Sequence, residues 1–180
     1  MPDPHIQRMK PWIDSFADDV AILEHVVDAA AVPRAARLIC ASALGYLVTR
    51  LDLIPDWEET AGILDDAMVL RTAMALASEN DLDPLEDDAQ RVIHRLANEN
   101  EVVRDFLGDD LYGKFKKYVD ELGNVVVRGR HPRVVLEDEK ERKQFFIEVK
   151  DQLKNFPPAP MKDPEAVART IKNYLSHKLK

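Results

Sequence analysis

Four aspartates stand close together in the sequence, and carboxylates at such a spacing can do chemistry. Asp52 and Asp56 flank Pro55 at the end of one apolar stretch, and Asp65 and Asp66 stand within the next. Oxygen ligands of this kind suit Mg²⁺, Mn²⁺ or Ca²⁺, and neighbouring carboxylates raise one another's pKa, as acid–base catalysis requires. One hypothesis is therefore a divalent-metal site of a metal-dependent hydrolase.

The same aspartates also fit structural roles in a turn between two helices. Asp56 with Glu59 is typical of a helix-capping pair, and Asp52 can accept hydrogen bonds from backbone N–H groups of its own turn. If the next helix begins a few residues later, Asp65 and Asp66 lie in its first turn, where the helix dipole favours carboxylates. Adjacent residues on a helix point about 100° apart, so at most one of that pair faces a given site. We favour this structural interpretation over the metal site.

Two apolar helices must position these aspartates. Between Arg37 and Arg50 the chain is apolar on every side of a helix, and only two residues between 67 and 77 are polar. A helix without a polar face is normally buried, so we expect a central antiparallel hairpin, formed by a helix over about residues 33–50 and the helix that follows the aspartates. Trp57 is expected to pack over the end of this hairpin.

Amphipathic periodicity predicts further helices. They cover about residues 12–31, 84–99, 101–122, 138–155 and 163–177. Residues 124–136 differ, because two β-prone triplets flank a turn there, and this pattern predicts a short β-hairpin or an extended crossing. The expected fold class is all-α, with six to seven helices around the buried hairpin.

The composition excludes several classes of protein. Of 180 residues, 46% are apolar and 32% charged, so the chain can build a core. Its one cysteine, Cys40, excludes an intrachain disulfide and is expected as a buried thiol. No apolar run approaches the roughly 20 residues of a membrane span, and the first residues show no secretory signal. We therefore expect a cytoplasmic protein without a transmembrane segment.

Charge is divided unevenly along the chain. Residues 1–110 contain 9 Lys and Arg against 23 Asp and Glu, whereas residues 111–180 contain 16 against 10. This asymmetry predicts an acidic helical domain over residues 1–110 and a basic C-terminal helical extension over residues 111–180, packed on it.

A basic arm in the extension is a candidate contact surface. Its members are Arg128, Arg130, His131 and Arg133, and such side chains meet phosphates or an acidic protein surface. Aromatic residues are not interleaved with them and the whole chain is acidic, which argues against nucleic-acid binding. We interpret the arm as lying over the chain's own acidic half. Peripheral contact with a membrane or a nucleic acid through the arm is the alternative.

A set of spaced residues around the aspartates carries a family resemblance. The set comprises Tyr46, Asp52, Leu53, Ile54, Pro55, Asp56, Gly62, Asp65 and Asp66. It resembles the core motif of the YkvA-like family, a bacterial domain of unknown function, over about residues 33–80. Three residues at two places depart from the family pattern, since Thr49 and Arg50 stand where it favours Ser-Pro, and Glu59 where it favours proline. The resemblance implies a fold, and no catalytic activity comes with it.

Buried helices without a catalytic constellation predict a non-catalytic helical protein-interaction or scaffold module. No cofactor is expected under this interpretation. The alternative is the metal-dependent hydrolase, with Mg²⁺, Mn²⁺ or Ca²⁺ held by Asp52, Asp56, Asp65 and Asp66. The expected partner is another protein or a second copy of the chain.

Overall fold

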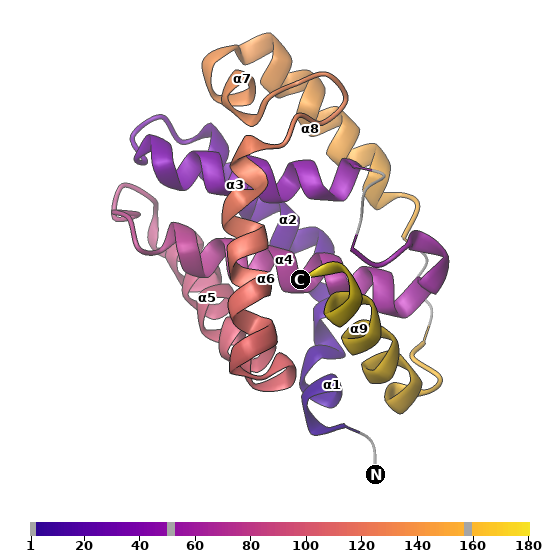
Figure 1. Ribbon diagram of the computed structural model, residues 1–180. Helices are drawn as coiled ribbons and strands as arrows, with labels where there is room; N and C mark the ends of the chain where they lie inside the picture. Colours follow the sequence, from indigo (N-terminus) through magenta and orange to yellow (C-terminus); the bar gives the residue numbers. More distant parts are fainter. Residues whose placement is uncertain (1–2, 50–52, 157–159) are drawn as a thin grey trace.

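A computed structural model describes residues 3–49, 53–156 and 160–180 of the chain (Figure 1). Within these ranges nine α-helices and two short 3₁₀ helices follow one another, which confirms the all-α fold class. Their bounds are α1 Pro4–Met9, α2 Pro11–Asp28, α3 Arg34–Val48, η1 Asp56–Glu58, α4 Glu59–Ala77, α5 Asp87–Leu107, α6 Asp109–Glu121, η2 Leu122–Asn124, α7 Pro132–Glu137, α8 Glu139–Leu153 and α9 Pro164–Lys178.

Helices α3 and α4 form the centre of the molecule. Nearly every residue of α4 and the second half of α3 are buried, as their all-round apolar character predicts. The end of α3 meets the start of α4, where Tyr46 contacts Asp65, so the two helices run antiparallel (Figure 1). Helix α2 packs on both, and α5 packs along α4. The predicted buried hairpin is confirmed.

The break between α5 and α6 lies at Gly108, and not near residue 100 where the sequence pattern placed it. Asn100 does not end the helix, because its side chain is satisfied by neighbours: its oxygen accepts from the Thr72 hydroxyl (2.8 Å), and its nitrogen donates to the Tyr112 hydroxyl (2.6 Å). Gly108 has a φ of +77°, which glycine adopts without a steric penalty. The chain changes direction there.

Of the two alternatives predicted for residues 124–136, a short β-hairpin or an extended crossing, the hairpin does not form. An isolated bridge joins Val127 to Arg130, and within the described residues it has no strand on either side. Residues 132–137 form α7 instead of a second strand. Pro132 fits the first helical position and the His131 side chain accepts from the backbone N–H of Arg133, so the start of this helix is well capped. The cap and the packing of α7 on α3 override the β propensity of its valines.

Helix α1 was not among the expected elements. Asp3 caps it by accepting from the backbone N–H of His5 (2.9 Å), and Pro4 opens it. Ile6 and Met9 are fully buried. Its six residues are too few to show a clear period in sequence, and burial of these two side chains stabilises it.

The C-terminal helices share one core with the hairpin. Helices α7 and α8 pack on α3, whereas α9 packs on α4 and α1. Phe115, Val149, Ile171 and Leu175 are fully buried members of the same contiguous cluster of apolar side chains. In the described part of the chain, no helix combines the length and apolarity that crossing a bilayer requires.

Candidate functional site

A buried phenol–carboxylate pair joins the two central helices. The Tyr46 hydroxyl, from the last turn of α3, donates to Oδ2 of Asp65 in the second turn of α4. The same hydroxyl accepts from the backbone N–H of Leu53 (2.7 Å), and the backbone of Ile54 also hydrogen-bonds to Asp65. The pair therefore holds the turn between α3 and α4. We call residues 53–58 the motif turn.

Burial sets the electrostatics of this pair. It raises the pKa of the Asp65 carboxyl to about 7, although the hydrogen bonds from Tyr46 and Ile54 oppose the rise. Burial, helped by the charges of Asp65 and Asp66, also raises the pKa of the Tyr46 hydroxyl well above its usual value. Oδ1 of Asp65 is buried and has no hydrogen-bond partner among the described residues. At neutral pH both the protonated and the ionised form of the Asp65 carboxyl are therefore populated.

The four predicted aspartates have different surroundings. Asp65 and Asp66 are both buried in α4, and Asp65 faces Tyr46. Asp52 lies outside the described residues, as does the side chain of Asp56, whose backbone begins η1. Across residues 3–49, 53–156 and 160–180, no group of three or more His, Cys, Asp or Glu side chains is arranged to hold a metal ion. Because α4 already begins at Glu59, Asp65 and Asp66 stand in its second turn and not in its first.

Trp57 is exposed, so its predicted packing over the hairpin is wrong. Its side chain lies 76% open to solvent on η1, the most exposed large apolar residue described. The position of this turn is nevertheless fixed. The Tyr174 hydroxyl of α9 donates to Oε1 of Glu58 (3.0 Å), and the Trp57 side chain hydrogen-bonds to the same tyrosine.

A groove of about 410 Å³ runs beside this tryptophan. One wall comes from η1 and the start of α4, and the other from the segment that leads into α9 and from the first turns of α9 itself. We call it the Trp57 groove; Trp57, Glu58, Glu59 and Ala61 line one side, and Lys162, Asp163, Val167 and Thr170 line the other.

A smaller cavity of about 130 Å³ lies next to Tyr46. Its walls are mainly apolar and include Tyr118, Leu122, Val127 and Pro132. The Tyr46 and Tyr118 rings form a T-shaped pair, with 6.2 Å between ring centroids. The C-terminal half of the chain therefore closes one side of the phenol–carboxylate pair.

A buried ion network, which the sequence analysis did not identify, joins α2, α4 and α5. Arg71 is fully buried, donates to Asp19 (2.9 Å) and to Glu99 (2.9 Å), and lies over the Trp12 ring at 4.0 Å. Arg95 donates to the other oxygen of Asp19 (2.6 Å). The sequence did contain a sign of this network, because it places a single arginine inside an apolar helix. A charge that is buried must have partners.

Arg130 of the basic arm is paired within the C-terminal half. It donates to Glu141 (3.0 Å) and to both oxygens of Glu148 (3.2 and 3.1 Å), all on α8. Arg128 lies 3.8 Å from the same Glu148. The predicted pairing of Arg128 and Arg130 with acidic residues of the N-terminal half is therefore wrong, although their segment lies against α3 through Val127 and Pro132. Their partners lie 11 to 20 residues further along the chain, on α8.

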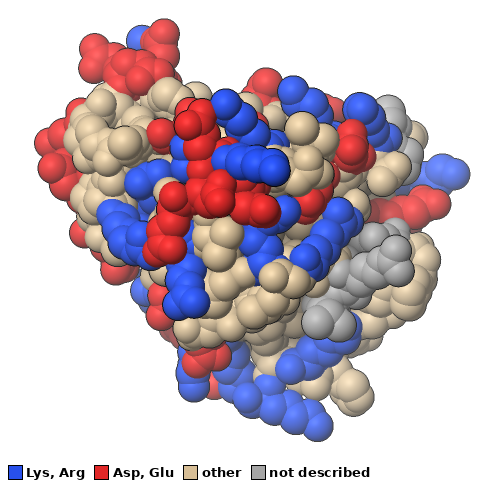
Figure 2. Space-filling view, turned by 90° about the horizontal axis from the view of Figure 1, so that it is seen from above, with Lys and Arg blue, Asp and Glu red and all other residues tan. Residues whose placement is uncertain are grey.

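The other two arm residues have local or solvent-facing positions. His131 caps α7 with Nδ1, and Arg133 is exposed. Figure 2 views the molecule from the side of α7 and α8, and it shows acidic and basic side chains interspersed over this face. Ion pairs between the two halves come from elsewhere, and they include Arg142 with Asp28 at 3.0 Å and Arg34 with Glu137 at 2.6 Å.

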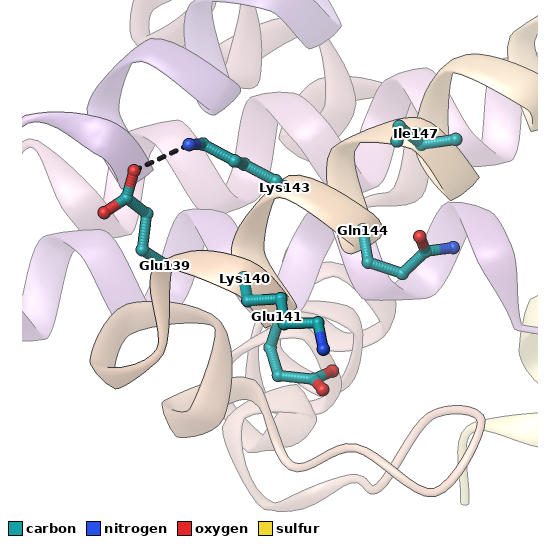
Figure 3. A pocket seen from close by; sticks show the side chains of 6 residues that line it. All are labelled: Glu139, Lys140, Glu141, Lys143, Gln144 and Ile147. Carbon is teal, nitrogen blue, oxygen red and sulfur yellow. Dashed lines mark ion pairs between the residues drawn. The ribbon is translucent and has the colours of Figure 1, made fainter.

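A wide hollow of about 610 Å³ lies over α8 (Figure 3). Four charged side chains line it, and three of them form close ion pairs: Lys143 pairs with Glu139 (2.7 Å), and Glu141 pairs with Arg130 (3.0 Å). Ile147 is the one apolar side chain among its lining residues and is half exposed. These features are typical of a solvated helix face, and they do not select a ligand.

Residues 36–71 match one family model. It is described as a protein of unknown function, DUF1232. The matched segment covers most of α3, the motif turn and α4 as far as Arg71, so it contains the Tyr46–Asp65 pair. Comparison with curated proteins and with solved structures produced no match. The match confirms a resemblance to a domain family of uncharacterised function, while the YkvA-like motif stays a prediction.

Proposed function

We propose that the protein is a non-catalytic helical protein-interaction module whose contact residue is Trp57. The observation that carries this proposal is the contrast between Trp57 in the motif turn and the buried pair that holds this turn. Asp65 and Tyr46 are buried and bonded to each other and to the backbone of the turn, whereas Trp57 is 76% exposed. Tryptophan is enriched among residues that dominate binding energy at protein interfaces. A cytoplasmic location belongs to the same proposal.

Photo-crosslinking in cells tests this function. A photoreactive phenylalanine at position 57 is expected to give adducts of defined mass that are absent when the same group replaces Ile147, a half-exposed residue on α8. Equal crosslinking from both positions would contradict the proposal. So would turnover of a phosphoester or peptide by the purified protein that Asp65→Asn abolishes.

A metal-dependent hydrolase is the second candidate. It would use Asp52, Asp56, Asp65 and Asp66, and the observation in its favour is the buried Oδ1 of Asp65, which has no hydrogen-bond partner among the described residues. Carboxylate oxygens suit Mg²⁺, Mn²⁺ or Ca²⁺. Calorimetry with each ion at millimolar concentration tests it, with Asp65→Asn as control. Heat of binding that this substitution removes would favour the hydrolase, and its absence would exclude it.

Peripheral contact through the basic arm is the third candidate. Arg128 and Arg133 are exposed, although Arg130 is satisfied within the protein. Binding to anionic vesicles or to nucleic acid through two arginines should weaken steeply with salt. Lack of binding even at low salt would exclude this candidate.

A further inference from the structure

The Trp57 groove combines an open aromatic face with carboxylates. Trp57 and Glu59 line one wall, and Asp163 lines the other. Glu58 also lines the groove, but its Oε1 already accepts from the Tyr174 hydroxyl at 3.0 Å. Among the described residues that line the groove, Lys162 is the one cationic side chain, so carboxylates outnumber cations there.

We propose that this groove binds an arginine side chain from an extended basic segment of a partner protein. The inference rests on the proposed function and names the chemistry of the partner. A guanidinium placed over an indole face is attracted by the negative potential of the ring, and a nearby carboxylate adds a charged hydrogen bond. The exposed indole supplies the first contact, and Glu59 or Asp163 supplies the second.

The protein already contains one example of the same interaction. Arg71 lies over the ring of Trp12 at 4.0 Å and donates to Asp19 and Glu99. In that internal site one guanidinium contacts an indole face and donates hydrogen bonds to two carboxylates. Trp57 and the carboxylates of its groove offer similar groups at the surface, and the lining residues that the structure describes include no guanidinium.

The walls of the Trp57 groove are preorganised by hydrogen bonds. Tyr174 fixes Glu58, and Asp163 caps α9 by accepting from the backbone N–H of Ala166 (3.0 Å). Both walls are therefore tied to helices, which lowers the cost of ordering them on binding. Charged walls on both sides disfavour an apolar helix as the occupant and favour a cation.

The two tryptophans make a direct test by NMR. The chain contains two tryptophans, so a nitrogen–proton spectrum holds two indole signals, and Trp57→Phe assigns them. The probe is a short capped peptide of alternating glycine and arginine. Its matched control replaces arginine with citrulline, which keeps the shape and removes the charge. We expect the arginine peptide to shift the Trp57 signal and to leave the signal of buried Trp12 unchanged.

Variants separate the two contacts. Trp57→Ala should weaken binding of the arginine peptide about two- to fivefold, as followed at the backbone amide of Ala61. Glu59→Gln should weaken it too, and the effect should shrink as salt screens the charge. Glu101→Gln, an exposed carboxylate on α5 that does not line the groove, should leave binding unchanged.

Each other outcome overturns this inference. Equal shifts with citrulline and arginine would show a groove that does not select charge. No shift with either peptide would remove the arginine site, while crosslinking from position 57 would still decide the proposed function. A Trp57 signal that moves with protein concentration alone would assign the groove to a second copy of the chain.

Discussion

At the scale of single residues, Tyr46 and Asp65 show how a reactive pair of groups can serve structure. A carboxyl with a pKa of about 7 beside a phenol has the properties of an acid–base catalyst. Here both groups are fully buried, and their hydrogen bonds are to each other and to the backbone of the motif turn. Burial alone explains the raised pKa, so the shift does not require a catalytic role.

The raised pKa of Asp65 predicts a pH-dependent stability. In the unfolded chain this carboxyl titrates near 3.8, and in the folded protein near 7. Between those values the folded state keeps a proton that the unfolded state has lost. Its contribution is therefore complete below about pH 4 and falls as pH rises toward about 7, by up to about 1.4 kcal/mol per pH unit.

Urea unfolding across that pH range measures this contribution. Asp65→Asn keeps an oxygen that accepts from Tyr46 but cannot titrate, so its stability should change less with pH than that of the wild type. The difference between the two curves isolates Asp65 from other titrating groups. Parallel curves would show that Asp65 has an ordinary pKa.

At the scale of helices, the start of α6 has one glycine that the backbone requires and one that it does not. Gly108 has a φ of +77° between α5 and α6, where a side chain is strained. Gly113 lies within α6, and an added Cβ there would meet no atom within 4 Å. We expect Gly108→Ala to cost about 1–3 kcal/mol and Gly113→Ala to add about 0.5–1 kcal/mol. Thermal unfolding followed by circular dichroism measures whether each substitution lowers or raises the stability. Equal effects of the two substitutions would contradict a helix break at Gly108.

The ion network between helices predicts a large loss when one member is removed. Arg71→Met leaves Asp19 buried without one of its partners and should destabilise the fold by about 3–5 kcal/mol. Arg91→Met makes the same chemical change in an exposed pair with Asp88, and should cost no more than about 1 kcal/mol. Chemical unfolding of both variants compares them. Similar losses would mean that the buried network contributes no more than a surface ion pair.

At the scale of the whole molecule, the acidic and basic parts of the chain share one core. Leu175 of α9 is fully buried, and α9 packs on α4 and α1. We therefore expect the chain to unfold in one transition, in which tryptophan fluorescence and circular dichroism coincide. The division into an acidic domain and a basic extension then describes charge and not independent folding. Two separate transitions would contradict this expectation.

A substitution in α9 measures the same coupling. Leu175→Ala should lower the free energy of unfolding by about 2–5 kcal/mol and shift both signals together. Ile147→Ala removes a half-exposed side chain of α8 and should have little effect. Loss of helical signal in Leu175→Ala without a change in tryptophan fluorescence would show that α9 folds separately.

The sequence by itself determined the helical class, the central hairpin and the burial of α3 and α4. Those features follow from the spacing of apolar residues along one helix, which is a local property. Helices α1 and α7 were missed because six residues are too few to show a period, and their caps and burial stabilise them.

Only the tertiary structure decided how the charged and aromatic residues are used. Tyr46 lies against Asp65, Arg71 against Asp19, and Trp57 stays open beside α9. The first two contacts join residues of different helices, and the exposure of Trp57 depends on how α9 packs beside it. A local sequence pattern does not specify which helices meet. The role of a carboxylate or an indole in this protein therefore depends on the neighbours that tertiary packing gives it.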